Sequence, residues 1–323
     1  MFAVRLVFSL QEAEQAGMSR ARIRHALRRG KLVRLRTGVY CDASFWHRSE
    51  EVPAARHALE VRAALIALRR PGWASHYSAA KLLELPVPYG QPEVVTISQL
   101  DRSAGRRAYP KLRLRSSWID EQDTTTAWGV PVLGPGRTCL DIAREFGFAA
   151  GLVLADAALA QGAANRADFE RIAAGMRRWS GVGDVDLVAH HASGRRESPI
   201  ESRSFAVFVD FGLPLPQCNQ WIIGGEHSRG GVRSDFAWKP HRVVGEADGR
   251  VKYVDPRRSP EVILIEEKTR QARIEEQGFV VVRWSGAEIE HRPDAVIDRI
   301  VRGSRIANAM YGVPPLISAK AVA

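Results

Sequence analysis

The feature that most constrains the fold of this chain is a pair of short apolar segments, VRSDFAW and HRVVGEA, within residues 232–247. Both are rich in Val, Phe and Trp, which favour strands, and the Lys-Pro pair that ends at Pro240 is typical of a turn. The pattern predicts an antiparallel hairpin in which Asp235 lies directly opposite Glu246. Because successive side chains of a strand alternate between faces, we expect Asp248 on the same face as Glu246.

Three carboxylates on one face of a sheet repel each other, so this cluster predicts a bound cation and at least one raised carboxyl pKa. Carboxylate oxygens suit Mg²⁺ or Mn²⁺, which makes Asp235, Glu246 and Asp248 the expected metal ligands. Lys252 follows within reach, as in a metal-dependent site that cleaves phosphodiester bonds. The alternative is an ordinary turn at Asp248-Gly249, with the other two acids on the solvated face of an antiparallel sheet.

The segments around the hairpin predict an α/β unit. Upstream, SPIESRSFAVFVDFG reads as a helix with Ser198 as its N-cap and Pro199 in its first turn. Glu201 is then either a cap residue, a fourth acid of the site, or both. Downstream, we expect a helix over residues 260–277, a buried strand over residues 279–285 and a last helix over residues 295–310. This order gives a small sheet flanked by helices.

From Glu201 to about Arg302 the chain resembles the very-short-patch-repair-like endonuclease domains of the PD-(D/E)XK restriction-endonuclease fold. The resemblance implies that Asp235 and Glu246 bind metal, and that Lys252 contacts the scissile phosphate or the attacking water. The sequence departs from the E-x-K pattern, because an aspartate occupies the usual lysine position. The residues that carry the resemblance are Glu201, Asp235, the string EADGRVK (246–252), Glu267-Lys268-x-Arg270 and Arg283-Trp284.

Positive charge is concentrated at the N-terminus. Residues 1–40 hold nine basic and two acidic residues, a net charge of +7 against +11 for the whole chain. SLQEAEQAG predicts a helix with Ser9 as cap and Gly17 as stop. RARIRHALRRG predicts a second helix that Ser19 caps and Gly30 ends. Together these segments indicate a helix-turn-helix.

The next segment, KLVRLRTGVY, alternates like a strand and turns at Thr37-Gly38, as the wing of a winged helix does. Arginines of the second helix would enter the major groove of double-stranded DNA, and wing residues would hold phosphates. The alternative is a solvated basic helix or a surface for an acidic protein. The residues expected to contact DNA are Arg20, Arg22, Arg24 and Arg28 on the helix, with Lys31, Arg34 and Arg36 on the wing.

This N-terminal segment also resembles the winged helix of AbiEi-type antitoxins, in the order Ala-Gly-x-Ser, Arg-x-Gly-x-Leu and Arg-x-Gly-Val-Tyr. A further string of that family, Arg-Thr-x-x-Asp at 137–141, opens a helix for which we expect Thr138 as cap. We expect His76, in the same middle region, to be a cap or core residue. The resemblance implies a transcriptional regulator of a toxin–antitoxin system, with a cognate toxin protein as partner.

The composition is that of a globular chain, with 45% hydrophobic and 26% charged residues. Cys41, Cys139 and Cys218 are odd in number and lack metal-binding spacing, which indicates buried thiols in a reducing cytoplasm. The first residues lack the apolar run of a signal peptide. The most apolar later segment, FAAGLVLADAALA, contains Asp156 and is too short to span a bilayer. We therefore expect a cytoplasmic protein without a membrane segment.

The sequence as a whole predicts a mixed α/β chain. We expect a DNA-binding protein whose C-terminal domain is a metal-dependent, endonuclease-like unit, a Mg-dependent deoxyribonuclease. The alternative is a non-catalytic antitoxin or repressor whose nuclease-like domain serves as scaffold or partner-binding surface. The intact Asp235 and Glu246 favour the first, and the displaced lysine favours the second. The expected domains are a winged helix (1–48), an α+β AbiEi-like middle domain (49–190), a linker (191–195), a restriction-endonuclease-like α/β/α domain (196–310) and a tail (311–323).

Overall fold

The structure is a computed structural model that divides into two compact units. The N-terminal unit comprises Met1–Gly147 and Gln161–Ala192, and the C-terminal unit comprises Phe148–Ala160 and Ser193–Ala323. The described residues are 6–88, 94–100, 111–226, 228, 230–249 and 260–317, without the side chains of 260–264. None of the helices within these ranges is long and apolar enough to cross a membrane. The three cysteines are free and buried, as expected.

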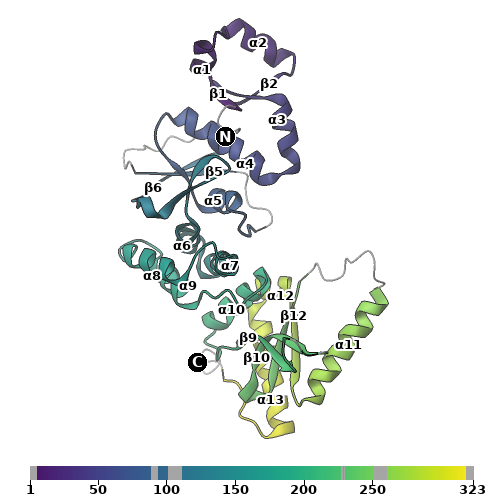
Figure 1. The fold of residues 1–323 in the computed structure, drawn as a ribbon. Helices are drawn as coiled ribbons and strands as arrows, with labels where there is room; N and C mark the ends of the chain where they lie inside the picture. The colour runs from purple at the N-terminus through teal and green to yellow at the C-terminus, as the bar shows by residue number, and fades with distance from the viewer. Residues whose placement is uncertain are drawn as a thin grey trace. The chain divides into compact units, whose positions relative to one another are not determined.

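The N-terminal unit begins with the predicted helix-turn-helix and wing (Figure 1). Ser9 and Glu12 form a capping box at the first helix, and the Ser19 hydroxyl caps the second by accepting from the Arg22 amide. Ile23 points inward into a small apolar core. The elements are β1 (Val7–Ser9), α1 (Leu10–Gln15), α2 (Arg20–Arg28), β2 (Leu32–Arg36) and β3 (Val39–Asp42), with sheet order β1-β3-β2.

Helix α4 (Pro53–Leu68) packs against two sheets at once. Leu59 and Ala63 pack on the winged-helix sheet, whereas Ala58 and Val61 belong to the core of a five-stranded sheet. That sheet has the order β6-β5-β4-β8-β7. Its strands are β4 (Trp73–Ala74), β5 (Val95–Gln99), β6 (Leu112–Ser116), β7 (Thr124–Ala127) and β8 (Val130–Leu133), and α3 (Ala43–Arg48) and α5 (His76–Leu82) complete this part.

Helix α6 (Pro135–Phe146) begins one turn earlier than we expected. Gly134, and not Thr138, is its N-cap, and the Thr138 hydroxyl donates to the Leu133 carbonyl at 3.0 Å. The AbiEi-like string therefore lies inside the helix. Its Arg137 and Asp141 form a buried ion pair with a 3.0 Å contact. Two more helices, α8 (Arg166–Gly175) and α9 (Val182–His191), pack on α6.

In the C-terminal unit, helices cover both faces of a four-stranded sheet of order β12-β11-β10-β9. On one face, Phe236, Trp238 and Trp284 pack around Phe208 of the helix over Pro199–Asp210. On the other face, Ile274 of the helix over Pro260–Glu276 joins an apolar cluster with Val232, Ala237 and Val244. The elements are α7 (Phe148–Ala160), α10 (Pro199–Asp210), β9 (Gln217–Ile223), β10 (Val232–Trp238), β11 (Val243–Asp248), α11 (Pro260–Glu276), β12 (Val280–Ser285), α12 (Gly286–His291) and α13 (Pro293–Tyr311).

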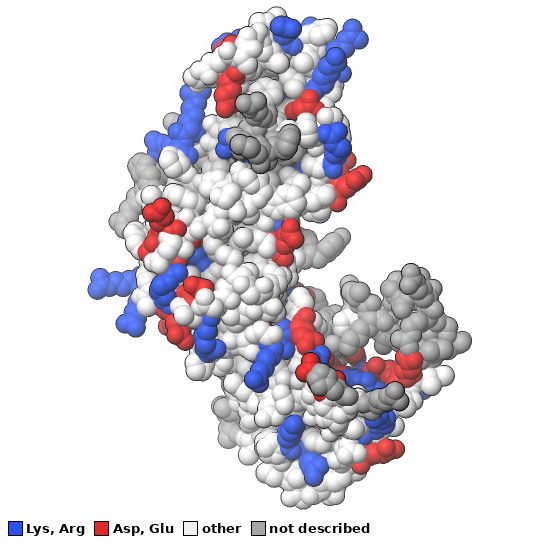
Figure 2. All heavy atoms as spheres, in the orientation of Figure 1, with Lys and Arg blue, Asp and Glu red and all other residues white. Residues whose placement is uncertain are grey.

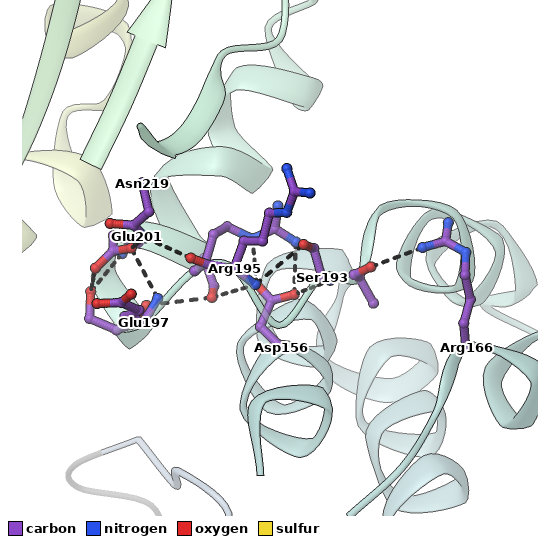
Figure 3. A network of polar contacts seen from close by, with 11 residues as sticks. Asp156, Arg166, Ser193, Arg195, Glu197, Glu201 and Asn219 are labelled. Atoms are coloured by element: carbon purple, nitrogen blue, oxygen red, sulfur yellow. Dashed lines mark hydrogen bonds and ion pairs between the residues drawn. The ribbon is translucent and has the colours of Figure 1, made fainter. Parts of the chain in front are cut away.

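Helix α7 was expected in the middle region, and in the structure it belongs to the C-terminal unit. Its buried Asp156 binds Arg196 through contacts of 2.5 and 2.7 Å. The same carboxylate accepts from the Ser193 amide and the Ser202 hydroxyl (Figure 3). These contacts connect α7 to Arg196, 40 residues further along the chain, and to Ser202 in the first turn of α10. The domain boundaries drawn from the sequence otherwise stay a prediction.

Candidate functional site

The hairpin of β10 and β11 has the predicted register. Phe236 pairs with Gly245, and continuing this register by one residue places Asp235 across from Glu246. The backbone ladder ends at Phe236 and Gly245, and just beyond it the Asp235 carboxylate accepts a hydrogen bond of 2.8 Å from the Ala247 amide. Beyond this point β11 continues in parallel pairing with β12. The two acids therefore lie where β10 and β11 separate.

Glu246 is the most perturbed acid of this site. Its side chain is only 1% exposed, and burial raises its pKa to about 7, with a further contribution from the charge of Asp235. The Arg270 guanidinium opposes this shift, because its Nη2 lies 2.9 Å from both carboxylate oxygens of Glu246. One raised carboxyl pKa was expected from repulsion between the acids, and burial proves to be the larger cause.

Asp248 shares the sheet face of Glu246 but has a different partner. Its carboxylate lies 3.5 Å from Arg283 of β12, and Arg283 also binds Glu267 of α11. Glu267 in turn lies 3.0 Å from Arg270, so the acids and the two arginines alternate in charge. The resemblance drawn from the sequence grouped these same residues, and the structure brings them together between α11 and the sheet.

This arrangement differs from a three-carboxylate metal site. Within the described ranges, no three His, Cys, Asp or Glu side chains are placed to hold one metal ion. Asp235 and Glu246 supply two adjacent carboxylates, and a metal would have to compete with Arg270 for Glu246. Lys252 lies outside the described residues. The metal ligands and the catalytic role of Lys252 therefore stay predictions.

Glu201 has the cap role that its position in α10 indicated. Its carboxylate accepts from the Ser198 hydroxyl at 2.6 Å, the Glu197 amide at 3.0 Å and the Asn219 side chain at 2.8 Å (Figure 3). These donors hold it at the start of the helix. Arg233 of β10 donates to both Glu197 carboxylate oxygens, at 2.8 and 2.6 Å, and this bond raises the Arg233 pKa, with smaller contributions from the charges of Glu201 and Asp235.

The second candidate site is the basic surface of α2 and the wing. Ile23 and Leu27 face the core, and the arginines of α2 lie outside it. Figure 2 shows Lys and Arg side chains projecting at the end of the unit that carries α2 and β2. Arg36 is the exception on the wing, since it is partly buried and donates to the Lys111 carbonyl at 3.4 Å. The exposed members of the predicted set are Arg20, Arg22, Arg24, Arg28, Lys31 and Arg34.

One polar cluster of the middle region was not anticipated from the sequence. His76 is buried, as expected, but its backbone has a positive φ of 53°. Its Nε2 lies 3.1 Å from Glu145, and this imidazole, with Arg115, lowers the pKa of Glu145 to about 2. Glu145 follows His76 by 69 residues in the sequence, so no local pattern indicates the pair.

Comparison with known proteins agrees with the N-terminal geometry. Residues 5–41 match the family described as "Transcriptional regulator, AbiEi antitoxin". Two Mycobacterium tuberculosis proteins, from strains CDC 1551 and H37Rv, are each 30% identical to this chain over 170 residues, and both are named as uncharacterized. That stretch is 52% of this chain and 59% of each relative, so the chain spans about three fifths of their length.

The family match covers the winged helix and confirms the AbiEi resemblance of this segment. The resemblance of residues 196–310 to endonuclease domains stays a prediction.

Proposed function

We propose that the chain is a DNA-binding transcriptional regulator of the antitoxin type. The observation that carries this proposal is the exposed arginine surface of α2 beside the wing, in a segment that matches the AbiEi regulator family. In this proposal α2 enters the major groove, where Arg22 and Arg24 contact base edges. Lys31 and Arg34 bind phosphates from the wing and orient the helix.

Binding to duplex DNA should weaken steeply with salt, because each neutralised phosphate releases counterions. Removing Lys31 or Arg34 should reduce the slope of log affinity against log salt by about one for each lost phosphate contact. Removing Arg22 and Arg24 should instead reduce the preference among sequences. Fluorescence anisotropy with a selected site and a scrambled duplex, over a salt series, separates the two effects.

The matched control is Arg177→Ala with Arg178→Ala, which removes two exposed arginines from the same unit outside the winged helix. Point variants are preferable to removal of residues 1–48, because Leu59 and Ala63 of α4 pack against this segment. If Arg22→Ala with Arg24→Ala binds both duplexes as the unchanged chain does, α2 is not the recognition helix.

The C-terminal unit is the proposed surface for a cognate toxin protein in this function. Its partly exposed Glu267, Arg270 and Arg283 alternate in charge between α11 and the sheet, and such a surface can discriminate between partners by charge complementarity. Co-purification with the product of a neighbouring toxin gene, before and after Glu267→Lys, tests the assignment. Retention of the complex by that variant would contradict it.

A second candidate function is metal-dependent cleavage of phosphodiester bonds at Asp235 and Glu246. The neighbouring carboxylates and the raised pKa of Glu246 favour it. A divalent cation would offset both the repulsion between the two acids and the cost of burying a charged carboxylate. Mg²⁺ or Mn²⁺ at one hundred times the dissociation constant should then stabilise the fold by about 2.7 kcal/mol. Asp235→Asn should abolish this stabilisation, whereas Glu276→Gln, an exposed change on α11, should keep it. A melting temperature that millimolar metal leaves unchanged would rule the metal site out.

A further inference from the structure

An apolar cavity of about 330 Å³ lies in the N-terminal unit, at the first half of α4. Its walls come from α3, α4 and the turn between β7 and β8, and include Phe45, Leu59, Trp128 and Val130. The volume is within the range of small-molecule pockets. Phe45 and Trp128 remain 37% and 39% exposed, so large apolar surfaces face an open concavity.

Two arginines give this apolar cavity a positive charge. Arg48 lies over the ring of Phe45, 4.5 Å from its centroid, and Arg62 lines the cavity from α4. The Arg62 Nε is buried and has no hydrogen-bond partner within the part of the chain that the structure describes. Because the Nε atom has no exposed surface, a ligand in the cavity would meet Arg62 at its outer guanidinium nitrogens, which form charge-assisted hydrogen bonds with a carboxylate.

The position of the cavity connects it to the winged helix. Leu59 lines the cavity and also packs against the sheet of β1, β2 and β3. Arg62 also lies near the first helix, because its charge makes a minor contribution to the lowered pKa of Glu12, whose main partner is Ser9. A ligand in the cavity would therefore contact two parts of the unit. One is α4, which packs against the sheet of the DNA-binding segment, and the other is the five-stranded sheet, at Val130.

We infer that this cavity is an effector site for a small amphipathic carboxylate, an aromatic or medium-chain apolar acid. The apolar body packs between Leu59, Trp128 and Val130, and the carboxylate pairs with Arg62. Occupancy changes the DNA affinity of the winged helix through α4. The binding site stands on the cavity alone, whereas the regulatory effect rests on the proposed DNA-binding function.

The test uses 2-naphthoate and decanoate as probes, with 2-naphthamide as the uncharged match, in titration calorimetry on the full chain. We expect both acids to bind, and 2-naphthoate to bind at least about tenfold tighter than the amide. Arg62→Gln should remove that preference, and Arg178→Gln, an exposed arginine of the same unit, should keep it. Ala55→Phe, which fills the cavity, should abolish binding of all three probes, and it tests the site even where Arg62→Gln does not fold.

Failure of both acids to bind at millimolar concentration, or unchanged binding by Ala55→Phe, overturns the site. DNA affinity is then measured with and without saturating acid. A severalfold change that Ala55→Phe removes supports the effector role, and an affinity that the acid leaves unchanged overturns it. A chain that binds the acid but no DNA contradicts the proposed function and the effector role, while the calorimetry still decides the site.

Discussion

Glu246 is held in an environment that favours its protonated form. Burial against α11 removes water from the carboxylate, Asp235 adds repulsion, and Arg270 offsets part of both, so that the pKa rises from 4.5 to about 7. In the unfolded chain the same group titrates near 4.5. Between pH 4.5 and about pH 7 the native state therefore keeps a proton on Glu246 that the unfolded state has lost.

The contribution of Glu246 to stability is fully present below about pH 4.5 and is lost as pH rises through about 7. The loss is on the order of 3 kcal/mol. Glu246→Gln keeps the shape and removes the titration, so the difference in free energy of unfolding between variant and parent should grow between pH 5 and pH 8 in favour of the variant. Urea denaturation at several pH values measures it, with Glu276→Gln as control. A difference that does not change with pH would contradict the raised pKa.

At the scale of elements, Gly245 of β11 is fixed by close packing. A Cβ at this position would overlap the Trp284 ring and lie 3.3 Å from Trp238. Gly245→Ala should therefore destabilise the C-terminal unit by about 1–3 kcal/mol through overpacking. Gly286→Ala is the control, since its Cβ would make only an ordinary contact of 3.6 Å with Ile200. Thermal unfolding of both variants, followed by near-ultraviolet circular dichroism, reports the difference. Equal melting temperatures would show that the ring can move.

Elements defined by local patterns could be predicted from the sequence. Ser9 and Ser19 cap their helices as predicted. A serine hydroxyl in this position accepts from an amide only three residues later, so the contact depends on local sequence alone. The hairpin register followed from the turn at Pro240. The prediction that Thr138 caps α6 was wrong, because Gly134 and Pro135 start the helix one turn earlier.

The candidate site depends on contacts that no local pattern contains. The pairing of β11 with β12 brings Arg283 beside Asp248 across 35 residues, and α11 brings Arg270 to Glu246 across 24. These arginines change the expected cluster of carboxylates into a network of alternating charge. Parallel pairing and helix placement depend on the whole sheet. The sequence therefore indicated which residues belong to the site, but not which arginine binds which carboxylate.

At the scale of the whole molecule, the buried pair of Asp156 and Arg196 connects α7 to the rest of the C-terminal unit. Their side chains are 1% and 3% exposed. Asp156→Asn should leave Arg196 uncompensated and destabilise this unit by roughly 3–5 kcal/mol. Arg203→Met, which breaks the half-exposed pair with Glu290, should cost at most about 1 kcal/mol.

Urea denaturation, followed by a probe in the C-terminal unit, compares the two variants. Asp156→Leu with Arg196→Met should recover part of the loss, because an apolar pair leaves no buried charge. Similar losses for Asp156→Asn and Arg203→Met would mean that the buried pair is not the main connection of α7.

The chain enters the C-terminal unit at Phe148, leaves it after Ala160 and returns at Ser193. On the ribosome, α7 is therefore complete before α10 exists. At 5–20 residues per second its partner follows roughly 2–8 seconds later. During that interval the apolar helix has no Arg196 for its aspartate, which makes it a candidate for chaperone binding. The same path means that no single cut in the chain separates the two units.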